Sequence, residues 1–410
     1  MKRRDFLKTG LGLMIGSQLV HLLAQQAEAA PRTPGSSKIL VLVQLAGGND
    51  GLNTVIPYTD PAYLKLRPAI GFKPDNIIKL NDKVALNPNM GPFETLFKAG
   101  KLAIIQGVGY PNPNRSHFRS IEIWQTAEPK KIKDTGWLGR YLDLSKTGKS
   151  TLDNVFPAIN VDPILPKQLS SEKVVVPSIN DIANFTFKAD PKNEADRKAQ
   201  LSTFSNIYQR YQLNRPYIEQ LRKVGLDTTE ASDSITKMVA AYKDGTKYPN
   251  NQFGRGMQFI AQMIIGGVNC PIYTISLGGF DTHTNEQRGH EGLFRTLCGG
   301  IQALQTDMEN HALDKDICIM TFSEFGRRVA ENGGRGTDHG AAAPMFMAGS
   351  NVNGTIIGDQ PSLVDLDDGD LKYKIDFRQV YASVLDKWLG ADSKQVLGDK
   401  FDQLDLFKTS

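Results

Sequence analysis

Short apolar runs recur along this chain and set its expected architecture. The first covers residues 39–45, and comparable runs cover residues 101–106, 271–277, 317–322 and 344–348. Apolar runs of this length are typical of strands that are buried on both faces of a sheet. We therefore predict five core strands.

Amphipathic stretches lie between the later runs. Apolar residues recur at helical spacing over residues 253–264 and again over residues 293–308, which predicts two helices that each bury one face. Strands that alternate with helices favour a parallel or mostly parallel sheet. The predicted fold class is α/β, with a mostly parallel sheet sandwiched by helices.

Residues 129–250 break this pattern. They are rich in Lys, Asp, Asn and Pro and hold few long apolar runs, so we interpret them as an insertion or cap that is partly helical. We expect one large domain over residues 39–410 that carries this insertion, after a linker at residues 30–38. Two domains are the alternative, since the chain exceeds what one ordinary core needs.

The first 29 residues have the features of a signal peptide. A basic start is followed by an apolar stretch and by an A-x-A cleavage site that ends at Ala29. The pattern Arg3-Arg4-x-Phe6-Leu7-Lys8 matches a twin-arginine signal. We predict a periplasmic or otherwise exported protein that meets the twin-arginine translocase during export. An ordinary signal or an uncleaved anchor is the alternative.

Charge and cysteine content narrow the function classes. The chain carries a net charge of +4, and cleavage after Ala29 would remove four basic and two acidic residues to leave +2. A nearly neutral protein is not expected to bind nucleic acid. Beyond the leader, no apolar run reaches membrane-spanning length. Cys270, Cys298 and Cys318 lie in apolar contexts, so we expect buried thiols, with one disulfide as an alternative in the periplasm.

Carboxylates and imidazoles follow several of the predicted strands. These candidates are Asp50, Asp281, His283, Glu324, Asp338 and His339. Such side chains are ligands of divalent metals, and residues at the carboxyl ends of parallel strands meet at one edge of the sheet. We therefore predict a metal site. Asp50 could instead cap a helix, and Glu324 could instead form an ion pair with a nearby arginine.

A second candidate segment follows the run at residues 101–106. Ser116 is expected near the start of a helix, where free backbone N–H groups bind anions and a neighbouring metal would activate its hydroxyl. Arg115 and Arg119 could hold phosphate or sulfate oxygens, and His117 is a candidate ligand or acid. The alternative is that Ser116 is only a helix N-cap.

The motifs carrying these residues are similar to an exported bacterial family known only as a domain of unknown function, number fifteen hundred and one. They are Leu45-Ala-Gly-Gly-Asn-Asp-Gly-Leu-Asn53, Tyr110-Pro-Asn-Pro-Asn-Arg-Ser-His-Phe118, Gly279-Phe-Asp-Thr-His283, Ser323-Glu-Phe-Gly-Arg327 and Gly336-Thr-Asp-His-Gly340. That family in turn resembles the alkaline phosphatase and sulfatase superfamily. The resemblance implies an α/β fold, one or two divalent metals and a Ser, Thr or modified Cys nucleophile.

The superfamily resemblance also implies roles for individual residues. Asp50 resembles the first metal-binding Asp, Ser116 resembles the nucleophile, and Asp281 with His283 resembles the next ligands. The later Asp-His pair resembles either Asp338-His339 or the segment of Glu324, which then leaves His339 as the last His of the superfamily. We favour the second alignment, because no His follows His339 in the sequence.

On this alignment, one metal is held by Asp281, His283 and His339, with Asp338 as a further candidate. Asp50 and Glu324 would hold a second, weaker or absent metal, because Phe325 replaces the usual His. The expected cofactor is Zn²⁺, Mg²⁺ or Ca²⁺.

These features lead to two hypotheses about function. The first is an exported metal-dependent hydrolase of phosphate esters with a metal-activated Ser nucleophile. Sulfate esters are the less favoured substrate class, because the sulfatase motif Cys-x-Pro-x-Arg is absent. Its small-molecule ester substrate would contact Arg119, Arg327 and Asn53. The second is a non-catalytic binding or assembly protein on a degraded hydrolase fold. A redox enzyme is a weak third option, because the glycine turn lacks the spacing of a dinucleotide loop.

Overall fold

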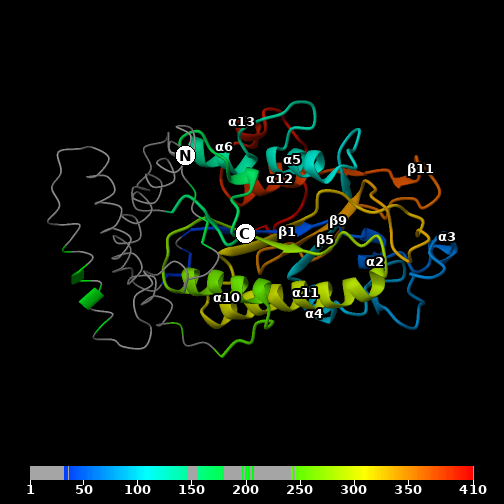
Figure 1. Cartoon of the computed structure of the whole chain (residues 1–410), viewed down its shortest axis with the longest axis horizontal. Helices are drawn as coiled ribbons and strands as arrows, with labels where there is room; N and C mark the ends of the chain where they lie inside the picture. Colours follow the sequence, from blue (N-terminus) through cyan, green and yellow to red (C-terminus); the bar gives the residue numbers. More distant parts are fainter. Residues whose placement is uncertain are drawn as a thin grey trace.

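A central sheet lies between two layers of helices (Figure 1). This computed structural model describes residues 32–35, 37–145, 156–174, 176, 178, 179, 242 and 245–409, with isolated positions between 196 and 206. The predicted signal peptide, and most of the predicted insertion at residues 129–250, lie outside the described residues. The α/β fold class is confirmed by this arrangement of sheet and helices.

The central sheet has eight strands in the order β10-β5-β9-β8-β1-β7-β6, with β13 also paired to β5. Its strands are β1 (Ile39–Ala46), β5 (Leu102–Gly109), β6 (Ile159–Asn160), β7 (Ile272–Gly278), β8 (Ile317–Phe322), β9 (Ala343–Ala348), β10 (Ile356–Ile357) and β13 (Ile375–Asp376). Only β9 runs antiparallel to its neighbours, β5 and β8. The sheet is therefore mostly parallel, as predicted.

Helices cover both faces of this sheet. Figure 1 shows α4, α10 and α11 on one side and α5, α6, α12 and α13 on the other. The helix bounds are α2 (Gly51–Thr54), α3 (Pro61–Leu66), α4 (Gly91–Lys98), α5 (His117–Thr126), α6 (Trp137–Ser145), α10 (Gln252–Ile265), α11 (Glu286–Asn310), α12 (Phe377–Lys387) and α13 (Ser393–Leu397), with a 3₁₀ turn, η1, at Lys167–Leu169.

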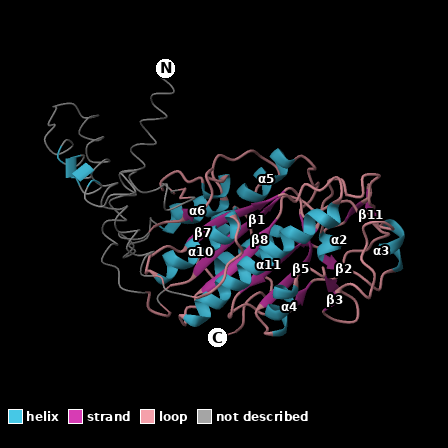
Figure 2. Cartoon of the chain, turned by 60° about the horizontal axis from the view of Figure 1, so that its bottom comes forward, coloured by secondary structure: helices cyan, strands magenta, loops and turns pink. Residues whose placement is uncertain are grey.

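Two smaller sheets lie outside the central one. They consist of β2 (Val55–Ile56), β4 (Ala85–Leu86) and β3 (Ile78–Lys79), and of the hairpin β11 (Leu366–Asp367) and β12 (Asp370–Leu371). Figure 2 shows β2 and β3 beside α2 and α3, at one end of the molecule.

The core explains why β1 is almost continuously apolar. Alternate side chains of a strand point to opposite faces. Val41 and Val43 pack into the core with α10 and α11, whereas Leu40 and Leu42 pack into the core with α5 and α12. Since both faces of the sheet are covered by helices, no position in the middle of β1 is exposed to solvent.

The structure also tests the remaining sequence expectations. All five predicted core strands and both predicted helices are present. The three cysteines are buried and free, so no disulfide joins them. We expected no sheet core in residues 129–250, yet β6 in that segment pairs with β7 at the edge of the sheet. None of the helices in the described part of the chain is both long and apolar enough to cross a membrane.

Candidate metal centre

The candidate residues are brought together by the directions of five strands. β1, β7 and β8 are parallel, and β5 and β8 are both antiparallel to β9. The carboxyl ends of β1, β5, β7 and β8 and the amino end of β9 therefore share one edge of the sheet. Open α/β sheets bind ligands at this edge.

Side chains from two loops and from the first residue of α5 converge at this edge. His117, Asp281 and His339 each offer a ligand atom within 4.8 Å of the other two, and this is the cluster of metal-ligating side chains found among the described residues. His283 Nε2 lies 3.0 Å from Asp281 Oδ1 and 3.0 Å from His339 Nε2. His339 Nε2 in turn lies 3.2 Å from Asp281 Oδ1. Four sequence candidates thus form one cluster.

In each histidine ring of the cluster, Nε2 faces the other ligands and Nδ1 lies beside a hydrogen-bond acceptor. His339 Nδ1 donates to the backbone carbonyl of Arg115 at 2.8 Å, so its proton is on Nδ1 and its Nε2 carries a lone pair. His283 Nδ1 lies 3.2 Å from Asp338 Oδ1. Hydrogen bonds from Asn332 and His283 lower the pKa of Asp338, which keeps this carboxylate an acceptor. The two Nε2 lone pairs therefore face each other, which is favourable only with a cation or proton between them.

His117 is oriented in the same way. Its Nδ1 lies 2.9 Å from Glu324 Oε1, and the same oxygen accepts the backbone N–H of Gly47 at 2.8 Å. His117 Nε2 is buried, lies 3.5 Å from Asp281 Oδ2 and has no hydrogen-bond partner in the described part of the chain. Phe325 packs against this ring, with 4.9 Å between ring centroids. Glu324 is thus a support behind a ligand rather than a member of the cluster.

Asp281 is held as a carboxylate. Arg327 donates to Asp281 Oδ1 at 2.7 Å. Burial alone would raise the pKa of Asp281, but the hydrogen bond from Arg327 is the largest opposing effect, and the pKa falls to about 2. Arg327 is buried and also donates to backbone carbonyls of Gly47, Gly48, Phe280 and Thr337. Its guanidinium therefore fixes the loops that carry Asp281 and His339.

The atom spacing in this cluster fits a tetrahedral metal ion. Metal–nitrogen bonds of about 2.0–2.1 Å place neighbouring ligand atoms roughly 3.3 Å apart around a tetrahedral ion. The distances among Asp281 Oδ1, His283 Nε2 and His339 Nε2 are 3.0, 3.0 and 3.2 Å. The unpartnered nitrogen of His117 supplies a fourth donor. Carboxylate or carbonyl acceptors on the outer nitrogens are also typical of metal-binding histidines.

Asp50 lies outside this cluster, in a separate buried network. Both of its oxygens accept hydrogen bonds from the guanidinium of Arg67, and neither side chain is exposed. Its side chain also caps α2 by accepting the backbone N–H of Leu52, which confirms the N-cap interpretation. Burial would raise the pKa of Asp50, but Arg67 outweighs burial and lowers it.

Glu286 completes that network. Burial, and then the charge of Asp50, raise the pKa of Glu286 well above its usual range, so it holds a proton at neutral pH. Asn53 donates to Glu286 Oε1 at 3.1 Å and accepts from Tyr63 at 2.7 Å. Asn53 is therefore buried in this network and not exposed to a substrate. Nearby, burial lowers the pKa of His290 to about 4.

Ser116 stands at the N-cap position of α5, next to the ligand His117. Its side chain is exposed, and its hydroxyl makes no capping hydrogen bond. Its backbone N–H donates to Asn114 Oδ1 at 2.9 Å. The hydroxyl is therefore not committed to the helix end.

The arginines that we expected to hold an anion are paired with carboxylates. Arg115 forms ion pairs with Asp370 at 2.6 Å and Asp368 at 3.0 Å. Arg119 donates to Glu122 at 2.8 Å and to two backbone carbonyls. Arg327 is engaged by Asp281, as described above. None of the three guanidinium groups stands free to bind an anion.

Sequence reasoning missed Arg67, Glu286 and His290. Arg67 lies outside every quoted motif, and no local signal connects it with Asp50. Glu286 and His290 follow the Asp281 motif and are four residues apart, so they share one face of α11. This spacing could have indicated that the two side chains lie next to each other on α11.

A family model described as Protein of unknown function (DUF1501) matches residues 37–403. No curated protein matches significantly.

Among solved structures, the PsFucS1 sulfatase from Pseudoalteromonas sp. is 13% identical, with 99% of this chain and 75% of that chain covered and a TM-score of 0.40. The lipoteichoic acid synthase LtaP from Listeria monocytogenes is 9% identical, with 93% and 79% covered and a TM-score of 0.34. The Zn complex of the C-terminal periplasmic domain of EcEptC from Escherichia coli is 11% identical, with 78% and 76% covered and a TM-score of 0.34.

Proposed function

This chain belongs to the DUF1501 family, and from its metal-ligating cluster we propose that it is a metal-dependent hydrolase. Phosphate esters are the favoured substrate class, and sulfate esters are less favoured because the motif Cys-x-Pro-x-Arg is absent. The observation that carries the proposal is the convergence of His117, Asp281, His283 and His339, with an acceptor behind each ring. Three imidazoles and one carboxylate favour Zn²⁺ over Mg²⁺ or Ca²⁺, which prefer oxygen ligands.

In this proposal the residues around the cluster have distinct roles. A bound divalent ion supplies Lewis acidity toward the ester oxygens. Glu324 and Asp338 orient ligand rings, and Arg327 orients Asp281, so these three are positioning residues. Ser116 is the proposed nucleophile, because its hydroxyl is exposed, uncommitted and adjacent to His117 in the sequence. Arg115 contributes its backbone carbonyl to His339 instead of a free guanidinium.

We further propose that the protein is exported. The support is the twin-arginine pattern and the A-x-A site in the sequence. The twin-arginine route carries folded proteins, so the metal could be bound before export. The translocase is then a transient partner. N-terminal sequencing of protein from the periplasmic fraction should give a chain that begins after Ala29.

The test of the hydrolase proposal is metal content together with turnover. Purified protein should contain about one metal ion per chain and should hydrolyse p-nitrophenyl phosphate or bis(p-nitrophenyl) phosphate. Asp281→Asn and His339→Ala should lose metal and turnover together, whereas Ser116→Ala should keep the metal and lose turnover. His311→Ala is the matched control, because His311 caps the C-terminal end of α11 and is not a member of the metal-ligating cluster. Native protein without bound metal, with every variant folded normally, would refute the proposal.

The engaged arginines favour the second hypothesis, a binding or assembly protein. Arg115, Arg119 and Arg327 are all paired with carboxylates, whereas a phosphoester hydrolase commonly uses such groups to bind the anion. A protein of this kind would bind metal at the cluster and show no turnover of aryl phosphates or sulfates when fully loaded. The assay above separates the two.

A further inference from the structure

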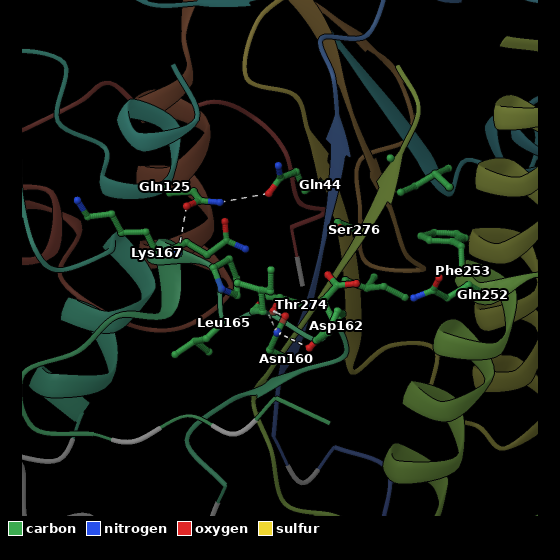
Figure 3. Close-up of a pocket in the computed structure, with 17 residues that line it drawn as sticks. Gln44, Gln125, Asn160, Asp162, Leu165, Lys167, Gln252, Phe253, Thr274 and Ser276 are labelled. Carbon is green, nitrogen blue, oxygen red and sulfur yellow. Dashed lines mark hydrogen bonds between the residues drawn. The ribbon is translucent and has the colours of Figure 1, made fainter. Parts of the chain in front are cut away.

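A cleft of about 680 Å³ opens beside the edge strand β6 (Figure 3). Its volume lies in the range of small-molecule sites. It is lined by β7, by the end of α5, by the start of α10 and by the loop that leads to η1. No role in the metal centre accounts for this cleft.

The cleft exists because β6 is short. Along β7, β6 pairs only with Tyr273 and Thr274, and Val161 then donates to the Thr274 carbonyl at 2.7 Å. Peptide groups alternate in direction along a strand, so those of Ser276 and Gly278 point to the same side as that of Thr274. The second half of β7 thus presents a strand edge to the cleft, on which Asp162 already accepts the backbone N–H of Ser276.

Neutral polar side chains dominate the lining. Five carboxamides line the cleft, namely Gln44, Gln125, Asn160, Gln168 and Gln252. The Asn160 carboxamide is used within the protein, by Asp162, Ile164, Ser178 and Thr274. A carboxamide has both donors and an acceptor, so the other four match hydroxyl groups, which also donate and accept. The Gln168 side chain is buried, with 2% of its surface exposed, and its Oε1 has no hydrogen-bond partner among the described residues. A buried acceptor of this kind needs a donor from a ligand or a water.

The lining contains one cationic and one acidic side chain, Lys167 and Asp162. Lys167 Nζ forms an ion pair with Glu122 at 2.6 Å, so it is not available to an anion. Asp162 lines the cleft and accepts hydrogen bonds from the hydroxyl and the backbone N–H of Ser276. Apolar surface from Ile164 and Phe253 completes the lining. Amides beside apolar surface, with no free cation, match a neutral hydroxyl-rich ligand better than a phosphate or an acidic peptide.

The cleft lies within reach of the metal centre. α5 begins at the ligand His117 and reaches Gln125 in the cleft eight residues later, which is about 12 Å along a helix. On the other side, Gly278 lines the cleft and Asp281 follows three residues later. One elongated molecule could therefore occupy both places.

We infer that this cleft binds the neutral saccharide part of the substrate and so presents a phosphate or sulfate ester to the metal centre. The saccharide subsite rests on the contacts above, and only its link to catalysis rests on the proposed function. Gln44 is the best residue to test, because its Oε1 accepts from Gln125 at 3.2 Å while its amide N–H groups are left for a ligand.

The test is binding of the full mature chain to an array of neutral oligosaccharides of two to six units, followed by calorimetry with the strongest binder. The wild type should bind with or without metal, and so should Asp281→Asn. Gln44→Leu should weaken binding about tenfold or more. Gln395→Leu, an exposed change on α13, is the matched control. If Gln44→Leu fails to fold, Gln252→Leu replaces it.

The outcomes separate the two proposals. Saccharide binding that Gln44→Leu weakens, in a protein that hydrolyses no ester, would keep the subsite and remove the hydrolase. Turnover of aryl phosphates without saccharide binding would support the hydrolase and rule out the saccharide subsite. The subsite is overturned if no saccharide binds, if Gln44→Leu binds as well as the wild type, or if an extended peptide pairs with the open edge of β7 instead.

Discussion

Removal of Arg67 should destabilise the protein strongly at neutral pH. Arg67 and Asp50 are both 0% exposed, and the guanidinium also donates to the carbonyls of Val329 and Arg328 at 2.8 Å. Arg67→Ala leaves the Asp50 charge buried without a partner, which costs about 3–5 kcal/mol. Lys98→Ala is the matched control. Its ion pair with Glu94 is at the surface, with Lys98 70% exposed, and is worth less than about 1 kcal/mol.

The pH dependence of this loss is a sharper test. Arg67 outweighs burial and holds the pKa of Asp50 below its unfolded value of 3.8. The ion pair therefore stabilises the fold fully above about pH 4, and this stabilisation is lost as the pH falls through the folded pKa. Without Arg67, burial is the largest remaining effect on Asp50 and raises its pKa, so protonation of Asp50 in acid lessens the destabilisation of the variant. The difference in free energy of unfolding should therefore shrink between about pH 7 and pH 4. Urea unfolding with EDTA, followed by tryptophan fluorescence, measures it. A loss below about 1 kcal/mol at pH 7, or one that does not change with pH, would refute the reasoning.

Three further predictions test the buried network and the metal centre. Burial and the charge of Asp50 raise the pKa of Glu286 above its usual 4.5, so the free energy of unfolding in EDTA should fall as the pH rises above 4.5. In Glu286→Gln, urea midpoints measured over the same pH range should fall less. Glu324→Gln should weaken metal binding about 10–100-fold in chelator competition, and an unchanged affinity would remove Glu324 as a positioning residue. A Cβ on Gly47 would lie 2.3 Å from the backbone nitrogen of Asp281. Gly47→Ala should therefore reduce metal affinity, whereas Gly100→Ala, with positive φ but open space, should not.

The core strands could be predicted because burial leaves a simple signal. Ile317–Phe322 was predicted and observed with identical ends, since helices on both faces require every position to be apolar. β6 gave no such signal, because it has only two residues and meets β7 only at Tyr273 and Thr274. A strand of this length depends on its partner and not on its own sequence pattern.

The candidate site divides along similar lines. Asp281, His283 and His339 could be predicted to meet because they flank strands that end at one edge of the sheet. Whether His117 reaches the metal depends on how α5 packs on the sheet. The sequence alone left two roles open for His117, a metal ligand or an acid. The role of Glu324 depends on its contact with His117, which is 207 positions away in the sequence. A contact over this separation cannot be inferred from the spacing of motifs.

The same reasoning bears on the number of metals. The sequence left open a second ion at Asp50 and Glu324, but the two carboxylates serve different partners. Both oxygens of Asp50 are bound by Arg67, whose guanidinium is not deprotonated in proteins. A metal at Asp50 would have to displace this cation and leave it buried without a counter-charge, at a cost of several kcal/mol. Arg67 therefore occupies the electrostatic position of a second ion, and the cluster around Asp281 is expected to hold one metal per chain.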